Sequence, residues 1–106
     1  MNLRTITAVL LLGLPLVSTR AAELAVPDNV TFERDITYAE AGGAKVQLNL
    51  ARPKNGSGPL PAVLCIHGGG FRAGSREGYN KLCLTLAQRG FVAVTISYRL
   101  APMHQF

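Results

Sequence analysis

The sequence predicts an α/β protein in which two antiparallel strands lead into a parallel strand–helix–strand unit. Two runs of alternating polarity, residues 31–38 and 45–51, come first. Two later runs, 62–66 and 91–96, are almost continuously apolar, which is typical of parallel strands covered on both faces. A segment with helical spacing lies between the two apolar runs, so we expect a right-handed crossover.

The first two strands are expected to form a hairpin with one solvated face. Gly42 and Gly43 lie between them and favour a turn. Apolar and polar side chains alternate in both runs, which predicts one inward and one outward face. The inward set is Phe32, Ile36 and Tyr38 with Val46, Leu48 and Leu50, and the outward set is Glu33, Asp35, Gln47 and Asn49.

A helix is expected between the two apolar strands. Residues 52–61, which join the second alternating run to the first apolar run, are rich in Pro and Gly and are expected to form an exposed connection. Ser75 suits the N-cap of the helix, and Arg89 and Gly90 mark its C-terminal end. The apolar face of this helix is predicted to consist of Tyr79, Leu82, Cys83, Leu86 and Ala87.

The first 22 residues have the pattern of a secretory signal peptide. Arg4 gives a positive start, residues 6–17 are uncharged and mostly apolar, and small residues follow. Cleavage is expected after Ala21 or Ala22, which leaves residues 23–106 as the mature chain in a secreted or periplasmic location. An uncleaved membrane anchor is the alternative, but the apolar run is shorter than the roughly 20 residues that span a bilayer.

The charged residues do not indicate a nucleic-acid surface. The chain of 106 residues has a formal net charge of +5. Its basic residues are scattered and form no block, and no aromatic platform alternates with them. An ordinary solvated surface accounts for this distribution.

Two interpretations of the two cysteines stay open. Cys65 and Cys83 would meet an oxidising compartment after export, where they could form a disulfide. They could equally be small buried thiols, since Cys65 lies in the most apolar strand and Cys83 on the apolar helix face. The second interpretation is the simpler one. No metal-ligand spacing joins the cysteines to His67 and His104, so no metal is expected.

The stretch His-Gly-Gly-Gly-Phe at residues 67–71 directly follows the strand predicted at 62–66. Glycines at a strand end leave backbone N–H groups that a substrate can approach closely. Ester hydrolysis passes through a tetrahedral intermediate with negative charge on oxygen, and N–H donors aimed at that oxygen stabilise it. The N-terminus of the next helix adds a favourable dipole. This turn is therefore a candidate oxyanion hole.

Two other interpretations of this turn stay open. Three glycines can also serve only a tight strand-to-helix turn that needs positive φ. Gly68, Gly70 and Ala73 match the dinucleotide-binding pattern, which would indicate an NADP-dependent oxidoreductase. In that fold the helix begins inside the pattern, whereas Gly74 and Gly78 delay it here.

The sequences at 67–71, 73–75 and 98–102, together with Phe106, resemble motifs of the α/β-hydrolase superfamily. More narrowly, they resemble the acetyl esterase/lipase group with a His-Gly-Gly-Gly motif, akin to hormone-sensitive lipase and bacterial carbohydrate esterases. The resemblance implies that residues 23–106 are the N-terminal portion of an α/β-hydrolase domain. The chain departs from the family pattern at Ser97, where the family often has Asp, and at Met103, where it often has Glu.

The resemblance implies that Gly69 and Gly70 donate the oxyanion N–H groups, while Gly68 and His67 shape the turn. His67 and His104 are not expected to be the general base, because the base follows the nucleophile in this fold. No Gly-x-Ser-x-Gly sequence occurs, so the Ser-Asp-His triad is absent from this chain. Outside the predicted signal peptide, the serines that lack that context are Ser57, Ser75 and Ser97.

The resemblance therefore implies a fragment of a secreted serine carboxylic-ester hydrolase, an acetyl- or feruloyl-type esterase or a lipase. Its substrate would be a small-molecule or carbohydrate ester, and no cofactor is expected. The chain alone is expected to be inactive because it lacks the nucleophile. A truncated non-catalytic binding module and a secreted serine peptidase of the same fold are the alternatives. No nucleic-acid partner is expected, nor a membrane contact after signal cleavage.

Overall fold

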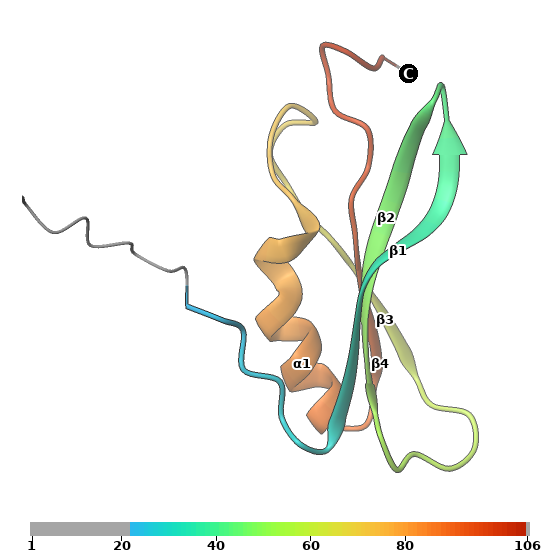
Figure 1. Cartoon of the computed structure of the whole chain (residues 1–106), viewed down its shortest axis with the longest axis vertical. Coiled ribbons are helices and arrows are strands. Elements are labelled where there is room, and N and C mark those ends of the chain that lie inside the picture. The colour runs from blue at the N-terminus through green and yellow to red at the C-terminus, as the bar shows by residue number, and fades with distance from the viewer. Residues whose placement is uncertain (1–21, 106) are drawn as a thin grey trace, which may run out of the picture.

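In the computed structural model, which describes residues 22–105, a single mixed sheet carries one α-helix on one face (Figure 1). Across the sheet the strands lie in the order β1-β2-β4-β3. The β1–β2 and β2–β4 pairs are antiparallel and the β3–β4 pair is parallel, which confirms the predicted α/β fold. The elements are β1 (Val30–Ala41), β2 (Ala44–Pro53), β3 (Ala62–Ile66), the 3₁₀ turn η1 (Arg76–Tyr79), α1 (Asn80–Gln88) and β4 (Val92–Ile96).

The predicted signal peptide lies outside the described residues, except for Ala22, and so does Phe106. Within the described part of the chain, no helix has the length and apolar character needed to cross a membrane. The same residues contain no cluster of three or more His, Cys, Asp or Glu side chains that could hold a metal ion.

The expected solvated face of the β1–β2 hairpin is wrong for β2. Asn49, predicted to face outward, is only 1% exposed. Its partner across the ladder is Thr95 of β4, which is completely buried on the face that α1 covers. Leu48 and Leu50 lie on the opposite face. The polar side chains alternate here because the interface with η1 and α1 contains a polar network, and not because that face meets water.

The register of β1 shifts at two irregularities, so its side chains do not keep one parity. Phe32 pairs with Ala51 on the α1 face, whereas Ile36 pairs with Leu48 on the opposite face. Asp35 lies at the first shift and has a φ of 59°. One extra residue in a strand reverses which face the following side chains take. The prediction that Phe32 and Ile36 share a face is therefore wrong.

The hydrophobic core lies between α1 and the sheet. The helix contributes Cys83, Leu84 and Ala87, and all three are buried. Leu82, which the sequence pattern placed on this face, is 44% exposed instead. Tyr79 and Leu86 pack against the core as the pattern predicts, and Leu84, which the pattern did not include, is buried in place of Leu82.

The end of α1 has the geometry of a Schellman motif. The N–H of Gly90 donates to the carbonyl of Ala87 and the N–H of Phe91 donates to the carbonyl of Leu86, both at 3.1 Å. Gly90 has a φ of 94°, which a residue with a side chain rarely adopts. The predicted helix end at Arg89 and Gly90 is confirmed.

The sheet face opposite α1 is apolar and is not covered by any helix among residues 22–105 (Figure 1). One row runs across all four strands, from Ile36 through Leu48 and Ile96 to Ile66. Ile66 and Leu64 on β3 are each 57% exposed. β3 is also an edge strand. The expectation of apolar strands is confirmed, but their cover on both faces is not found in this part of the chain.

We expect Gly90→Ala to destabilise the chain by about 1 kcal/mol, because the substitution forces a side chain into a left-handed conformation. An added Cβ at Gly90 would contact nothing within 4 Å, so the cost is purely conformational. Urea denaturation followed by circular dichroism measures the change. Gly78→Ala is the matched control, since its Cβ also meets nothing within 4 Å and its φ is not left-handed. Equal stabilities for the two variants would contradict this account of the helix end.

Candidate active site

The segments that follow β3 and β4 meet at one end of the sheet. Because these two strands are parallel, their carboxyl ends lie side by side. In Figure 1 the turn after β3 and the chain after β4 extend beyond the same end of the sheet. A hollow of about 630 Å³ lies between them. Its lining includes Gly68, Gly69, Gly70 and Phe71 from the turn, and Tyr98 and His104 from the second segment.

Gly69 is required by both its conformation and its surroundings. Its φ is 131°, and a Cβ at this position would lie 2.1 Å from the carbonyl oxygen of Ala73. That close approach arises because the carbonyl of Gly69 accepts the N–H groups of Arg72, at 3.1 Å, and Ala73, at 3.2 Å. The turn thus folds back on itself at Gly69. Gly70 has a φ of 61°, but a Cβ there would meet nothing within 4 Å.

The backbone N–H groups of Gly69 and Gly70 have no hydrogen-bond acceptor within residues 22–105. Both residues line the hollow. Both glycines are exposed, so their two neighbouring N–H groups are open to an acceptor that enters the hollow from outside. The geometry is therefore compatible with the oxyanion role predicted for these two glycines.

His67 is held inside the turn and is 7% exposed. Its ring stacks on the ring of Tyr98 with a centroid distance of 4.3 Å, and its Nδ1 lies 2.9 Å from the carbonyl oxygen of Gly68. On another side the ring abuts Gly74, where a Cβ would lie 2.4 Å from Nδ1. These contacts enclose the imidazole and support the expectation that His67 shapes the turn.

Two hydrogen bonds fasten the turn to the segment after β4. The hydroxyl of Tyr98 donates to the carbonyl of His67 at 2.6 Å, and the N–H of Ala101 donates to the carbonyl of Phe71 at 2.8 Å. Phe71 has a φ of 59°, an uncommon conformation for a bulky residue, so the turn is strained where this second bond holds it. These two bonds give a physical reason why the sequence motifs at residues 67–71 and 98–102 occur together.

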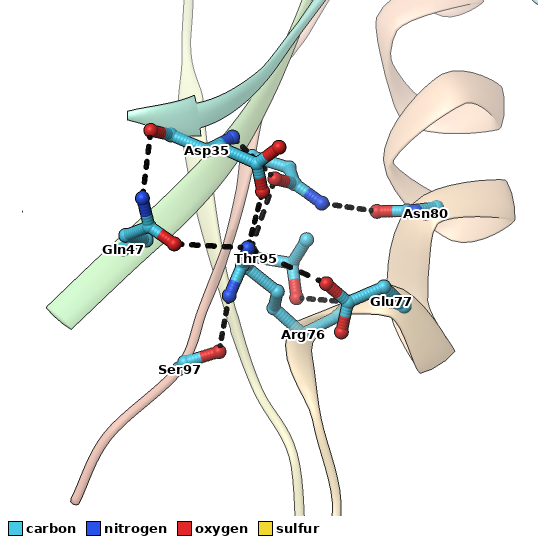
Figure 2. A network of polar contacts seen from close by, with 8 residues as sticks. Asp35, Gln47, Arg76, Glu77, Asn80, Thr95 and Ser97 are labelled. Carbon is cyan, nitrogen blue, oxygen red and sulfur yellow. Dashed lines mark hydrogen bonds and ion pairs between the residues drawn. The ribbon is translucent and has the colours of Figure 1, made fainter. Parts of the chain in front are cut away.

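Arg76 anchors the end of the turn through a network of polar contacts (Figure 2). Its side chain is 13% exposed. Its guanidinium donates to the side chains of Asn49 at 3.1 Å and Ser97 at 2.9 Å, and pairs with the carboxylate of Asp35. Its backbone carbonyl accepts the hydroxyl of Thr95 at 2.9 Å. One side chain at the start of η1 thereby connects to β1, to β2 and to the end of β4.

The network extends to α1 through buried amides. Asn49 donates to the side-chain carbonyl of Asn80, the first residue of α1, at 2.9 Å. Glu77 lies 3.5 Å from the Arg76 guanidinium. Burial raises the pKa of Glu77, but hydrogen bonds from the Ser75 side chain and from the backbone of Glu77, together with the charge of Arg76, outweigh burial and leave that pKa below its usual value. The sequence showed Arg76 only as one of several scattered basic residues, because its partners are distant along the chain.

Several other predicted residues also take definite places. His104 lines the hollow and its N–H donates to the carbonyl of Leu100 at 3.2 Å. Arg99 is exposed and its guanidinium reaches the hairpin turn, where a Cβ on Gly42 would lie 3.6 Å away. Ser97, which stands where the family often has Asp, binds Arg76. No serine or aspartate lines the hollow within the described residues.

A family model described as BD-FAE matches residues 48–106, more than half of the chain. The chain belongs to the BD-FAE family. Bacterial heroin esterase has a similar structure, with a TM-score of 0.61 and 34% sequence identity over 80% of this chain and 27% of that one. The resemblance to α/β-hydrolase esterases is thereby confirmed.

Two curated relatives of this BD-FAE chain have named activities. Ethyl acetate hydrolase of Pseudomonas putida is 35% identical over 75 residues, which are 68% of this chain and 24% of that protein. Kynurenine formamidase of Danio rerio is 35% identical over 68 residues, which are 64% of this chain and 22% of that protein. The chain spans about a quarter of the length of these relatives.

Replacing Arg76 with methionine should destabilise the protein by about 2–4 kcal/mol, because the substitution removes the charged hydrogen bonds that a mostly buried guanidinium donates to Asn49, Ser97 and Asp35. Arg76→Lys should recover only part of this loss, since an ammonium cannot match the several acceptors at once. Urea denaturation measures both. Arg72→Met is the control, as the exposed Arg72 side chain has no polar partner within residues 22–105. A similar loss in the control would contradict the assigned role of Arg76.

Gly69→Ala should disrupt the turn far more than Gly70→Ala. Both positions have left-handed φ values, which cost an alanine roughly 1–2 kcal/mol. Only Gly69 also faces a backbone oxygen at 2.1 Å, which cannot be relieved by moving a side chain. Amide hydrogen exchange of Arg72 and Ala73, whose N–H groups bind the Gly69 carbonyl, reports the disruption. Equal exchange rates in the two variants would rule out this backbone packing.

Proposed function

We propose that this BD-FAE chain supplies the oxyanion hole of an exported carboxylic-ester hydrolase, with Gly69 and Gly70 as the N–H donors. The observation that carries the proposal is the pair of unpaired N–H groups at the wall of the hollow. Donors fixed in place before the reaction stabilise the tetrahedral oxyanion without reorganisation. Similarity to an ethyl acetate hydrolase and to a heroin esterase supports ester chemistry.

The chain's own residues orient the donors and hold the turn rigid. Tyr98 and Ala101 fix its two ends by hydrogen bonds, and His67 fills the space behind the glycines. The nucleophile, the acid and the base would come from sequence beyond this chain, because the described lining of the hollow offers no serine or aspartate. The chain alone is therefore proposed to be inactive.

The hollow suits an ester with an uncharged, partly apolar group. Phe71 and Ile66 line the hollow and are 61% and 57% exposed. Apolar walls with a few fixed polar groups are typical of small-molecule sites. An acetyl or feruloyl ester of a small alcohol or a carbohydrate fits this description. Export rests on the signal-peptide pattern of residues 1–22.

Amide hydrolysis on the same machinery is the second candidate. It is favoured by the similarity to kynurenine formamidase, whose name indicates a formamide substrate. Amide and ester hydrolysis share the tetrahedral oxyanion, so the same two donors would serve either. Parallel assays with an activated ester and an activated formanilide would separate the two candidates.

The role of Gly70 can be tested in a chimera in which residues 48–105 replace the matching segment of bacterial heroin esterase. The chimera should hydrolyse p-nitrophenyl acetate. Gly70→glycolate replaces only the N–H of residue 70 with an ester oxygen, and should lower kcat by about 10²–10³ with little change in KM. Such a split identifies an interaction made in the transition state.

The matched control is Ala73→lactate, which deletes the hydrogen bond from the Ala73 N–H to Gly69 and loosens the same turn. This control should retain most of the activity. An equal loss of activity in the two backbone-ester variants would show that turn stability, and not oxyanion binding, sets the rate.

The chain by itself should not hydrolyse p-nitrophenyl acetate faster than its Gly69→Pro variant does. Turnover above that background would contradict the proposal that the nucleophile, the acid and the base lie outside this chain.

A further inference from the structure

The two cysteines of the chain meet in the core between β3 and α1. The Sγ atoms of Cys65 and Cys83 are 4.0 Å apart, and both residues are free thiols. Cys65 is 8% exposed and Cys83 is completely buried. The chain contains no further cysteine, so these two have no competing partner within it. The proposed ester chemistry uses neither of them.

We propose that Cys65 and Cys83 form a redox-convertible pair, in which a disulfide-bearing oxidant converts the two thiols into one bond between β3 and α1. The oxidant is a small-molecule disulfide or a protein disulfide. A thiolate of the pair attacks one sulfur of the oxidant, forms a mixed disulfide and releases one thiol. The second cysteine then attacks the mixed disulfide, forms the Cys65–Cys83 bond and releases the second thiol. The oxidant is reduced by two electrons and the pair is oxidised by two.

The fold brings the reacting atoms into van der Waals contact before any bond exists. A disulfide needs the sulfur atoms about 2 Å apart, so the two sulfurs must approach by about a further 2 Å. Holding two groups in contact gives an intramolecular step a high effective concentration. The bond would join two residues that are 18 positions apart and would close a loop that contains the whole glycine turn.

The location of the pair gives the bond a structural consequence. Ile66 alone separates Cys65 from His67, so the bond would lie directly beneath the glycine turn. β3 is an edge strand whose one partner among the described residues is β4. A covalent link to α1 would give this strand a second attachment and would restrict motion of the turn. This inference stands independently of the proposed esterase activity.

Burial and the neighbouring Cys65 raise the pKa of Cys83 to about 12. The remaining strands present uncharged residues to α1 here, namely Asn49, Ala51, Ala93 and Thr95. Because the thiolate is the attacking form, oxidation of the folded pair should be slow near neutral pH and should accelerate as the pH rises. An unfolded thiol has its usual pKa near 9, so the reduced fold should lose stability between pH 9 and 12.

The test uses the full chain, reduced and then incubated with oxidised and reduced glutathione in native buffer. Samples are denatured, alkylated with iodoacetamide and weighed by intact-mass spectrometry. We expect a monomer that has lost two hydrogen atoms and accepts no alkyl group, and that regains both sites after dithiothreitol. The oxidised chain should melt roughly 10 °C higher than the reduced chain, as expected for a loop of this length.

A parallel incubation in guanidinium chloride measures how far the fold itself favours the bond. The effective concentration of the pair should be at least about tenfold higher in native buffer. Cys83→Ser is the matched control and should give only a mixed disulfide or a free thiol at Cys65. Alkylation after denaturation reads the bond directly, so the result does not require this variant to fold.

Two results for the monomeric chain would overturn the proposal. One is two alkylated thiols after the native oxidation has run to equilibrium at alkaline pH, when the guanidinium sample forms the bond, because the fold would then hold the sulfurs apart. The other is a bridged chain that melts below the reduced chain, because the bond would then distort the packing of α1 on β3. Disulfide-linked dimers in place of the bridged monomer would count against it in the same way.

Discussion

The candidate site depends on the hydrogen bonds that join the turn after β3 to the segment after β4. Tyr98 binds the carbonyl of His67 and Ala101 binds that of Phe71, so both ends of the glycine turn are fixed from outside. Parallel pairing of β3 with β4 makes these contacts available, because it brings the two carboxyl ends to the same edge. Within the turn, Phe71 is strained by its positive φ, and these bonds hold it in that conformation.

The sequence predicted this region well because its signals are local. An apolar run of five residues that ends in His-Gly-Gly-Gly predicts a strand followed by a close backbone approach, and β3 has the predicted bounds. The glycines have the positive φ values that the tight turn needs, at Gly69 and Gly70. The oxyanion role of these residues is a hypothesis that the geometry supports and that hydrolysis assays must decide.

The sequence failed where distant residues decide the outcome. Asn49 looked like a solvated position because polar residues alternate with leucines in β2, but it binds Arg76 and Asn80, far along the chain. A register shift in β1 at Asp35 also reversed the face on which the following side chains were expected to lie, and no local sequence pattern predicts such a shift. Alternation reports that two faces differ, and it does not tell which one meets water.

The two faces of the sheet therefore have different roles, one in stability and the other beside the hollow. The α1 face carries the core, the Arg76 network and the cysteine pair, and these contacts hold the end of the turn from below. The opposite face presents an apolar row that ends at the exposed Ile66, beside the hollow. Apolar surface of this kind is stable only when it is covered, by further sequence or by a partner. Because Ile66 also lines the hollow, a segment that covers this residue would contact the hollow as well, so protection of the edge strand and enclosure of the site are coupled.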